Sequence, residues 1–264
     1  MKVLVVKKYN PIVNGVWTFT VDLCNLLVNN NIHVDLWQYD ETTEMPPNDY
    51  DIIFFHINGM EKAFEKYRGS KRFFVHGLMS EMYVPNNFYD VVYTFGERAL
   101  NHIQHCDKRL IRNFVDLNKF KPVNNIGHGV LLHSYWNNDN LKQLFSKTKY
   151  EYSVSATKKI PKLISKHKII IAYGRSAIEA FAMGKPTLIY GENGGDGFLD
   201  DSTLTKCMET NCSGWSIRNL EAPDKISIEK IENLIDNYKV NSEINRYLAE
   251  QYFDGNLYFE KLIS

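Results

Sequence analysis

The stretch KIIIAYGRSAIEAFAMGKPTLIYG, residues 168–191, decides the fold because it passes from one structural period to another and back. Residues 168–173 form a mostly apolar run of strand length, and Gly174 permits a tight turn. Residues 175–183 have helical spacing, Gly184 ends that helix, and residues 187–191 form a second apolar run. The stretch therefore predicts a strand, a short helix and a second strand, the unit from which parallel sheets are built.

The same alternation recurs along the chain. Further apolar runs of strand length lie at residues 2–6, 32–37, 51–56, 72–76, 90–95, 129–135 and 150–156. Helical spacing after Gly15 predicts a helix ending near residues 29–31, and further helices are expected at about 138–147 and 158–166. Buried strands that alternate with amphipathic helices predict a doubly wound α/β fold.

The pattern pauses at residues 120–129, where Pro, Asn and Gly cluster, and then resumes. We therefore expect two consecutive Rossmann-like halves. The tail from Ile226 to Ser264 reads as two helices, with Ser227 at the N-cap of the first and Glu229 and Glu232 in its opening turns.

Composition limits the classes of function. Lys and Arg number 31, as do Asp and Glu, so no net positive charge draws the chain to nucleic acid. The four cysteines show no paired spacing, which favours reduced thiols and a cytoplasmic location. The apolar run near the N-terminus is too short for a signal sequence or a membrane span, so no transmembrane segment is expected.

Several familiar motifs fail or are weak. GENGGDG at 191–197 is not the dinucleotide fingerprint, and GKP at 184–186 lacks the remainder of a P-loop. Asp49-Tyr50-Asp51 has the form of a metal-binding DxD motif, but it follows Pro46-Pro47, where aspartates shape turns. HIQHC at 102–106 lacks the second ligand cluster of a structural zinc site. No metal site is predicted.

Arg175 and Glu179 place two charges in a helix that otherwise reads as core. A helix that starts at the carboxyl end of a parallel strand favours a phosphate at its N-terminus, and a carboxylate one turn later can accept ribose hydroxyls. The two side chains, four residues apart, can instead form an ion pair on a helix packed through its alanines. Residue patterns alone leave both interpretations open.

Four segments, in order along the chain, resemble the GT-B glycosyltransferases of family 4, which include glycogen synthases and bacterial mannosyl- and glucosyltransferases. They are the loop with Asn14-Gly15-Val16, the strand end FFVHGL with His76, the segment IRNFVDLNKFKP at 111–122, and the stretch around Glu179. The resemblance implies a GT-B fold: two Rossmann-like domains with parallel sheets facing a central cleft. Residues 1–120 would form the acceptor-side domain and 121–242 the nucleotide-sugar-binding domain, with a C-terminal helix at 243–264 returning to the first.

The resemblance also implies an activity and a site. The activity is retaining, metal-independent transfer of a hexose from a nucleotide diphosphate sugar to an acceptor hydroxyl, such as that of a glycan, with no cofactor beyond this co-substrate. His76 would lie beside the donor sugar, and His56 ends the preceding strand in the same way. The residues expected to bind the donor are Asn14, Gly15, Val16, Gly174, Arg175, Ser176, Ala177 and Glu179.

The sequence departs from the family pattern at two places. Ile171 stands where the family has a first glutamate, and the basic pair after the first strand of the second half is missing, since only Lys142 is basic there and it comes too late. We expect Arg175 to substitute as a phosphate clamp and to share the catalytic role with His76. Two alternatives stay open: a phage-type transferase acting on a modified base in DNA, which the zero net charge does not favour, and a non-catalytic nucleotide-sugar-binding protein.

Overall fold

A computed structural model describes residues 1–9, 15–40, 43–77, 87–122, 127–133, 139–154, 160–239 and 241–264. The chain forms two compact units. The first consists of Met1–Arg112 together with Gly255–Ser264, and the second of Asn113–Asp254. Each unit is built on its own sheet, as the sequence predicts. The assignment of acceptor-side and donor-side roles to residues 1–120, 121–242 and 243–264 stays a prediction.

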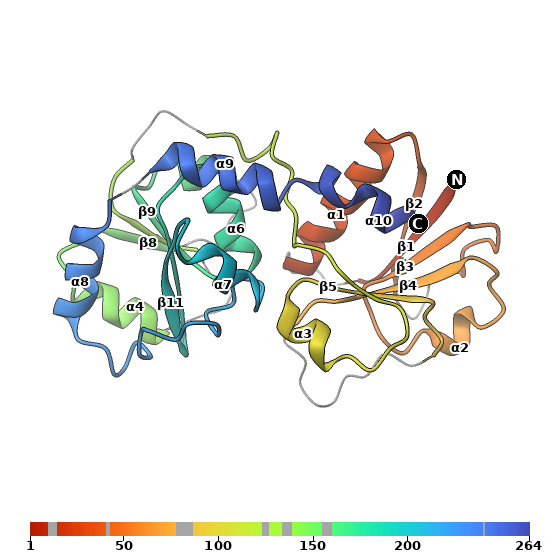
Figure 1. Cartoon of the computed structure of the whole chain (residues 1–264), viewed down its shortest axis with the longest axis horizontal. Coiled ribbons are helices and arrows are strands. Elements are labelled where there is room, and N and C mark those ends of the chain that lie inside the picture. Colours follow the sequence, from red (N-terminus) through yellow and green to blue (C-terminus); the bar gives the residue numbers. More distant parts are fainter. Residues whose placement is uncertain are drawn as a thin grey trace. The chain divides into compact units, whose positions relative to one another are not determined.

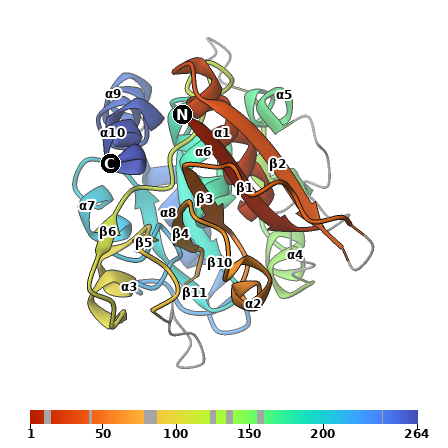
Figure 2. The ribbon, with the colours of Figure 1, turned by 90° about the vertical axis from the view of Figure 1, so that its right-hand side faces the viewer.

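The sheet of the first unit has six parallel strands in the order β2-β1-β3-β4-β5-β6 (Figure 2). The strands are β1 (Lys2–Lys8), β2 (His33–Tyr39), β3 (Ile52–Phe55), β4 (Ser70–Val75), β5 (Val91–Thr94) and β6 (Lys108–Leu110). The first five confirm the apolar runs. The runs failed to reveal β6, because this short strand, KRL, carries two basic residues.

The helices of the first unit are α1 (Gly15–Asn29), α2 (Glu61–Phe64), α3 (Glu97–His102), the 3-10 helix η1 (Gly255–Tyr258) and α10 (Phe259–Ile263). The spacing after Gly15 correctly predicted α1, whose Phe19, Leu23 and Leu27 are fully buried. A hydrogen bond ties α10 to the rest of this unit, because buried Arg72 donates to the carbonyl of Leu262. The two-helix interpretation of the tail therefore missed η1 and α10.

The sheet of the second unit has the order β11-β10-β9-β7-β8. Its strands are β7 (Val130–Leu132), β8 (Tyr152–Val154), β9 (Ile169–Ala172), β10 (Thr187–Gly191) and β11 (Gly194–Leu199). All pairs are parallel except β10 with β11, which forms an antiparallel edge. GENGGDG supplies this hairpin, and the buried carboxylate of Asp196 accepts hydrogen bonds from the amides of Ile217 and Arg218. The acidic, glycine-rich segment thus has a structural use.

Helices cover both faces of this second sheet. They are α4 (Asp139–Ser146), α5 (Ile160–Ser165), α6 (Arg175–Ala182), α7 (Leu204–Met208), α8 (Ile228–Asn237) and α9 (Ser242–Tyr252). Residues of α5, α6, α7 and α9 share one hydrophobic cluster, and those of α4 and α8 share another. Figure 1 shows α6 beside α9, with α4 and α8 across the sheet. No helix within the described ranges is long and apolar enough to span a membrane.

Each sheet contains a point where the strand order reverses. In the first unit this point lies between β1 and β3, and in the second between β7 and β9. The helices that follow β7 and β9, α4 and α6, belong to clusters on opposite faces. Open α/β sheets bind ligands outside the carboxyl ends of their strands at such a switch point. The fold therefore directs attention to these two edges.

The hydroxyl of Ser227 caps α8, as the sequence predicts, accepting a hydrogen bond from the amide of Lys230 at 3.1 Å. Replacing an N-cap serine by alanine leaves a helix amide unsatisfied. We expect Ser227→Ala to lower the free energy of unfolding by about 1 kcal/mol, measured by urea denaturation. The control, Ser227→Asp, keeps an acceptor at the cap and should match the wild type. An alanine variant as stable as the wild type would contradict this role.

Candidate functional site

The turn between β9 and α6 lies at the switch point of the second unit. Gly174 has φ +56° and ψ −136°, a conformation that side chains disfavour. Its N–H donates to the carbonyl of Cys212 at 2.6 Å, and its own carbonyl accepts from the amides of Ala177 and Ile178. The glycine thus starts α6 directly after the strand, with the positive end of the helix at the carboxyl edge of the sheet.

Arg175 is buried and bonded within its own unit. Its Nη1 donates to Asn113 Oδ1 at 2.9 Å and to the carbonyl of Phe114 at 2.7 Å, and its Nε donates to Glu179 Oε1 at 3.1 Å. The ion pair that one interpretation predicted is therefore present. In this conformation the guanidinium faces protein groups, so its contact with a phosphate stays a prediction.

Glu179 has one carboxylate oxygen bonded and one available. The side chain is 2% exposed, Oε1 receives the bond from Arg175, and Oε2 has no hydrogen-bond partner within the described residues. Buried polar atoms are nearly always bonded, so an exception needs a reason. An acceptor at the switch point, one turn into α6, is what a hydroxyl-bearing ligand would use.

Sequence reasoning missed His133, which lies next to this acceptor. The residue directly follows β7, is 1% exposed, and donates its backbone N–H to the carbonyl of Ile171 at 2.8 Å. Its Nε2 lies 3.8 Å from Glu179 Oε2. The available signal was a histidine at the end of the run GVLL, the same kind of signal that drew attention to His76.

The two departures from the family pattern have structural explanations. Ile171 lies inside β9 and is 1% exposed, so its position belongs to the sheet core. Lys142 lies in the middle of α4 and pairs with Asp139 at 3.2 Å. Neither residue faces the turn that starts α6.

In the first unit, His56 and His76 lie together. His56 Nδ1 and His76 Nε2 are 2.7 Å apart, and the ring of His56 stacks on Phe74 at 4.8 Å. Gly15 and Val16 begin α1, while Asn14 lies outside the described residues. The structure thus joins His56 to His76, and it places Gly174, Arg175, Ser176, Ala177 and Glu179 together at the start of α6.

Burial lowers the pKa of His56 well below 6.5, and the neighbouring charges of His76 and Lys7 lower it further. His56 is therefore neutral near neutral pH. Its Nε2 is buried and has no hydrogen-bond partner among the residues described.

The weaker motifs have structural roles. Asp49 bonds the ammonium of Lys2 at 2.8 Å, and Asp51 accepts from the amide of Lys2 at 2.7 Å, both near the start of β3. His105 is held by the carbonyls of Tyr89 and Asp107. Within the described part of the chain no three His, Cys, Asp or Glu side chains gather as metal ligands.

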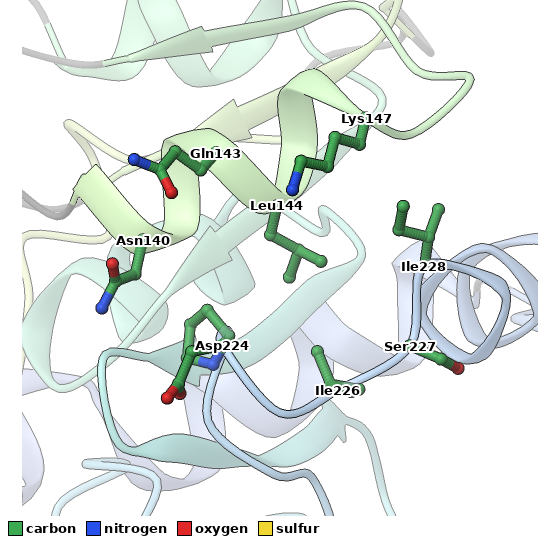
Figure 3. A pocket seen from close by; sticks show the side chains of 9 residues that line it. Asn140, Gln143, Leu144, Lys147, Asp224, Ile226, Ser227 and Ile228 are labelled. Carbon is green, nitrogen blue, oxygen red and sulfur yellow. The ribbon is translucent and has the colours of Figure 1, made fainter.

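A cavity of about 320 Å³ lies in the second unit between α4 and residues 223–228. Figure 3 shows Leu144 of α4 directed toward the segment that carries Asp224 and Ile226. The lining residues are Asn140, Gln143, Leu144, Lys147, Pro223, Asp224, Ile226, Ser227 and Ile228. None of them is a predicted site residue, and α4 and α6 cover opposite faces of the sheet.

The comparisons with known proteins identify the fold. The sequence matches no protein-family model and no curated protein. A structure titled alpha-glucosyltransferase in complex with UDP-glucose and DNA containing an abasic site is 11% identical, with a TM-score of 0.60, covering 99% of this chain and 98% of that one. The same enzyme with UDP and a 13-mer DNA containing an HMU base gives 10% identity, the same coverage and a TM-score of 0.64.

A second kind of structure agrees. MurG of Acinetobacter baumannii is 8% identical, with a TM-score of 0.55, and the match covers 100% of this chain and 98% of that one. At such identities the likeness carries the fold alone. The chain has the GT-B fold, as the sequence predicts.

The lowered pKa of His56 predicts a dependence of stability on pH. Below about pH 6.5 the unfolded chain binds a proton that folded His56 does not, so stability falls as the pH falls. We expect His56→Phe, which keeps a ring on Phe74, to reduce this loss between pH 6.5 and 5 by up to about 1.4 kcal/mol per pH unit in urea titrations. The exposed His33→Gln is the control. A His56→Phe slope equal to that of the wild type would contradict the prediction.

Proposed function

We propose that this chain is a glycosyltransferase, related to family 4, that moves a hexose from a nucleotide diphosphate sugar to an acceptor hydroxyl with retention and without a metal ion. The observation that carries the proposal is Glu179, whose Oε2 is buried and unbonded among the described residues at the start of α6. A carboxylate so placed can accept the two hydroxyls of a ribose. The GT-B fold supports this use, because Glu179 lies on the helix that follows β9, at the switch point between β7 and β9.

The remaining donor contacts follow from the same turn. Gly174 has no side chain, so a ligand can approach the backbone closely at this turn. The backbone amides near Ser176 and Ala177 lie at the N-terminus of α6, the positive end of the helix dipole. A diphosphate placed there would be stabilised as charge develops on the leaving group. The roles of Asn14, Gly15, Val16 and His76 toward the donor are carried over from the resemblance, and the cytoplasmic location is inferred from the unpaired spacing of the four cysteines.

Arg175 has a more restricted role in this proposal. Contact with a phosphate would require its guanidinium to give up bonds to Asn113 or Phe114. As it stands, it fixes one oxygen of Glu179 and leaves the other for the ligand. We therefore expect Arg175 to orient the carboxylate, with phosphate clamping as its second possible task.

Nucleotide binding should depend on Glu179. In a thermal-shift screen with UDP-, GDP-, ADP- and TDP-sugars, we expect one nucleotide to stabilise the wild type by about 2.7 kcal/mol at a hundred times its dissociation constant. Glu179→Gln should lose that shift, because a neutral amide accepts hydrogen bonds from ribose hydroxyls more weakly than the charged oxygen Oε2 does. The exposed Glu192→Gln is the matched control and should keep it.

Unfolding of the variant would confuse this result, so a second variant is needed. Removing Glu179 alone leaves Arg175 buried without its counter-charge. Replacing both by methionine removes the whole pair and should fold better than either single variant while still failing to bind nucleotide. Full nucleotide binding by this double variant would refute the proposal. Measuring whether the wild type releases free nucleotide from a nucleotide sugar distinguishes an enzyme from a non-catalytic binding protein.

A second candidate function differs in its acceptor. Similar structures of alpha-glucosyltransferase contain DNA as well as UDP or UDP-glucose, and each spans nearly the whole of this chain. We infer that a base in DNA is an acceptor worth testing, although the chain has no net positive charge.

Sugar transfer to DNA can be measured directly. With a radiolabelled nucleotide sugar, this candidate predicts label in a duplex containing an HMU base and none in the unmodified duplex. Duplex binding should weaken steeply with added salt, because phosphate contacts release counterions. Transfer to a glycan acceptor with no label in either duplex would leave the main proposal and eliminate this one.

A further inference from the structure

Basic side chains lie at or just after the carboxyl ends of three strands of the first unit, on one face of the sheet. Lys7 and His56 each follow the last paired positions of β1 and β3, and His76 directly follows β4. Side chains alternate across a sheet, so Lys7, His56, Phe74 and His76 share the face that α1 covers. Phe19 of α1 has its ring 5.9 Å from His56 and 5.6 Å from His76, as this arrangement requires.

Within the described residues, no carboxylate neutralises the charge of Lys7. The residue is 4% exposed, and its Nζ donates to the carbonyl of Lys8 at 3.0 Å and lies 5.1 Å from the centre of the Trp17 ring. No carboxylate of the described residues lies within ion-pair distance of it. A buried ammonium without a counter-charge is costly, and burial lowers the pKa of Lys7 accordingly. An anion beside it would remove that cost.

The histidine pair adds directed hydrogen-bond donors. Only one hydrogen can lie between His56 Nδ1 and His76 Nε2 at 2.7 Å. Because His56 Nε2 is buried without a partner within the described chain, the tautomer that avoids an orphan N–H puts the hydrogen of His56 on Nδ1. His76 then accepts at Nε2 and, when neutral, carries its own hydrogen on Nδ1. The pair thus fixes which nitrogen of His76 donates.

The location is one where ligands bind. Lys7 is the next-to-last residue of β1 and His56 follows β3, and the strand order reverses between these two strands. Crevices outside the carboxyl ends of strands at such a reversal bind ligands in open α/β sheets. The uncompensated charge and the ordered imidazoles therefore coincide with the edge that the topology selects.

We propose that Lys7, with the His56–His76 pair, binds a phosphoryl group at the carboxyl edge of the first unit. A lysine serves as a point charge for phosphate, and the oxygens of a phosphoryl group can accept from an ammonium and an imidazole together. The group can belong to a nucleoside diphosphate or to a phosphodiester of nucleic acid. The site does not depend on the function proposed above, because inorganic phosphate, with neither nucleoside nor sugar, can probe it.

Histidine NMR of the whole chain tests the site. Inorganic phosphate is titrated at constant ionic strength, and the imidazole resonances are assigned with His56→Phe and His76→Gln. We expect the His76 resonance to shift saturably. Lys7→Met should weaken phosphate binding about tenfold or more, the loss expected for one charged hydrogen bond. Lys8→Met, which removes the adjacent exposed charge, should leave the titration unchanged.

Lys7→Met suits this test because it replaces a buried charge by an apolar chain of similar length, a change that folds tolerate. An unchanged phosphate affinity in Lys7→Met, or a wild-type titration that moves neither histidine, would overturn the proposal. Displacement of phosphate by UDP would identify a diphosphate ligand, and salt-sensitive displacement by duplex DNA a phosphodiester; displacement by neither would also contradict it. A phosphate response that persists in Glu179→Gln while nucleotide binding is lost separates this site from the contact made by Glu179.

Discussion

The candidate site of the second unit depends on the hydrogen bonds that the guanidinium of Arg175 donates. This guanidinium joins α6 to the segment that enters this unit, through Asn113 and Phe114, and holds one oxygen of Glu179. A buried charge pair is stable only when its remaining polar atoms are bonded, and most of these are. Within the described residues Glu179 Oε2 has no hydrogen-bond partner, so this oxygen is the atom of the pair that a ligand donor would satisfy. The carboxylate of Glu179 thus both stabilises the buried charge of Arg175 and offers an acceptor to a ligand.

In both units, buried ionisable side chains lie near the point where the strand order of the sheet reverses. Each sheet reverses its strand order once, and buried polar side chains lie at the carboxyl ends of the strands at that reversal: Lys7 and His56 in the first unit, His133 in the second. Polar groups are costly inside a core, and the carboxyl edge is where a ligand can compensate them. The two edges differ in charge, because the first carries basic groups and the second is built around a carboxylate held by Arg175.

Much of this could be predicted from the sequence because the strands are continuous apolar runs. The stretch around α6 gave its strand, glycine turn and helix correctly, and Ser227 was recognisable as a cap because its acceptor precedes a helical pattern. The edge hairpin containing Asp196 was not predicted, since the glycine-rich sequence of its second strand resembles a loop. His133 was missed because a lone histidine after a strand gains meaning only from the carboxylate that the fold brings to 3.8 Å.

The central claim is that Glu179 Oε2 accepts ribose hydroxyls, and changing the ligand tests it most directly. The affinities of UDP and of 2′,3′-dideoxy-UDP would be measured by calorimetry for the wild type and for Glu179→Gln. If the thermal-shift screen selects another nucleotide, that nucleotide and its dideoxy form replace the two UDP ligands. We expect the wild type to lose about tenfold or more in affinity when the hydroxyls are removed, the range for hydrogen bonds to a charged group, and the variant to bind both ligands equally weakly. A wild type that binds both ligands equally well would contradict it.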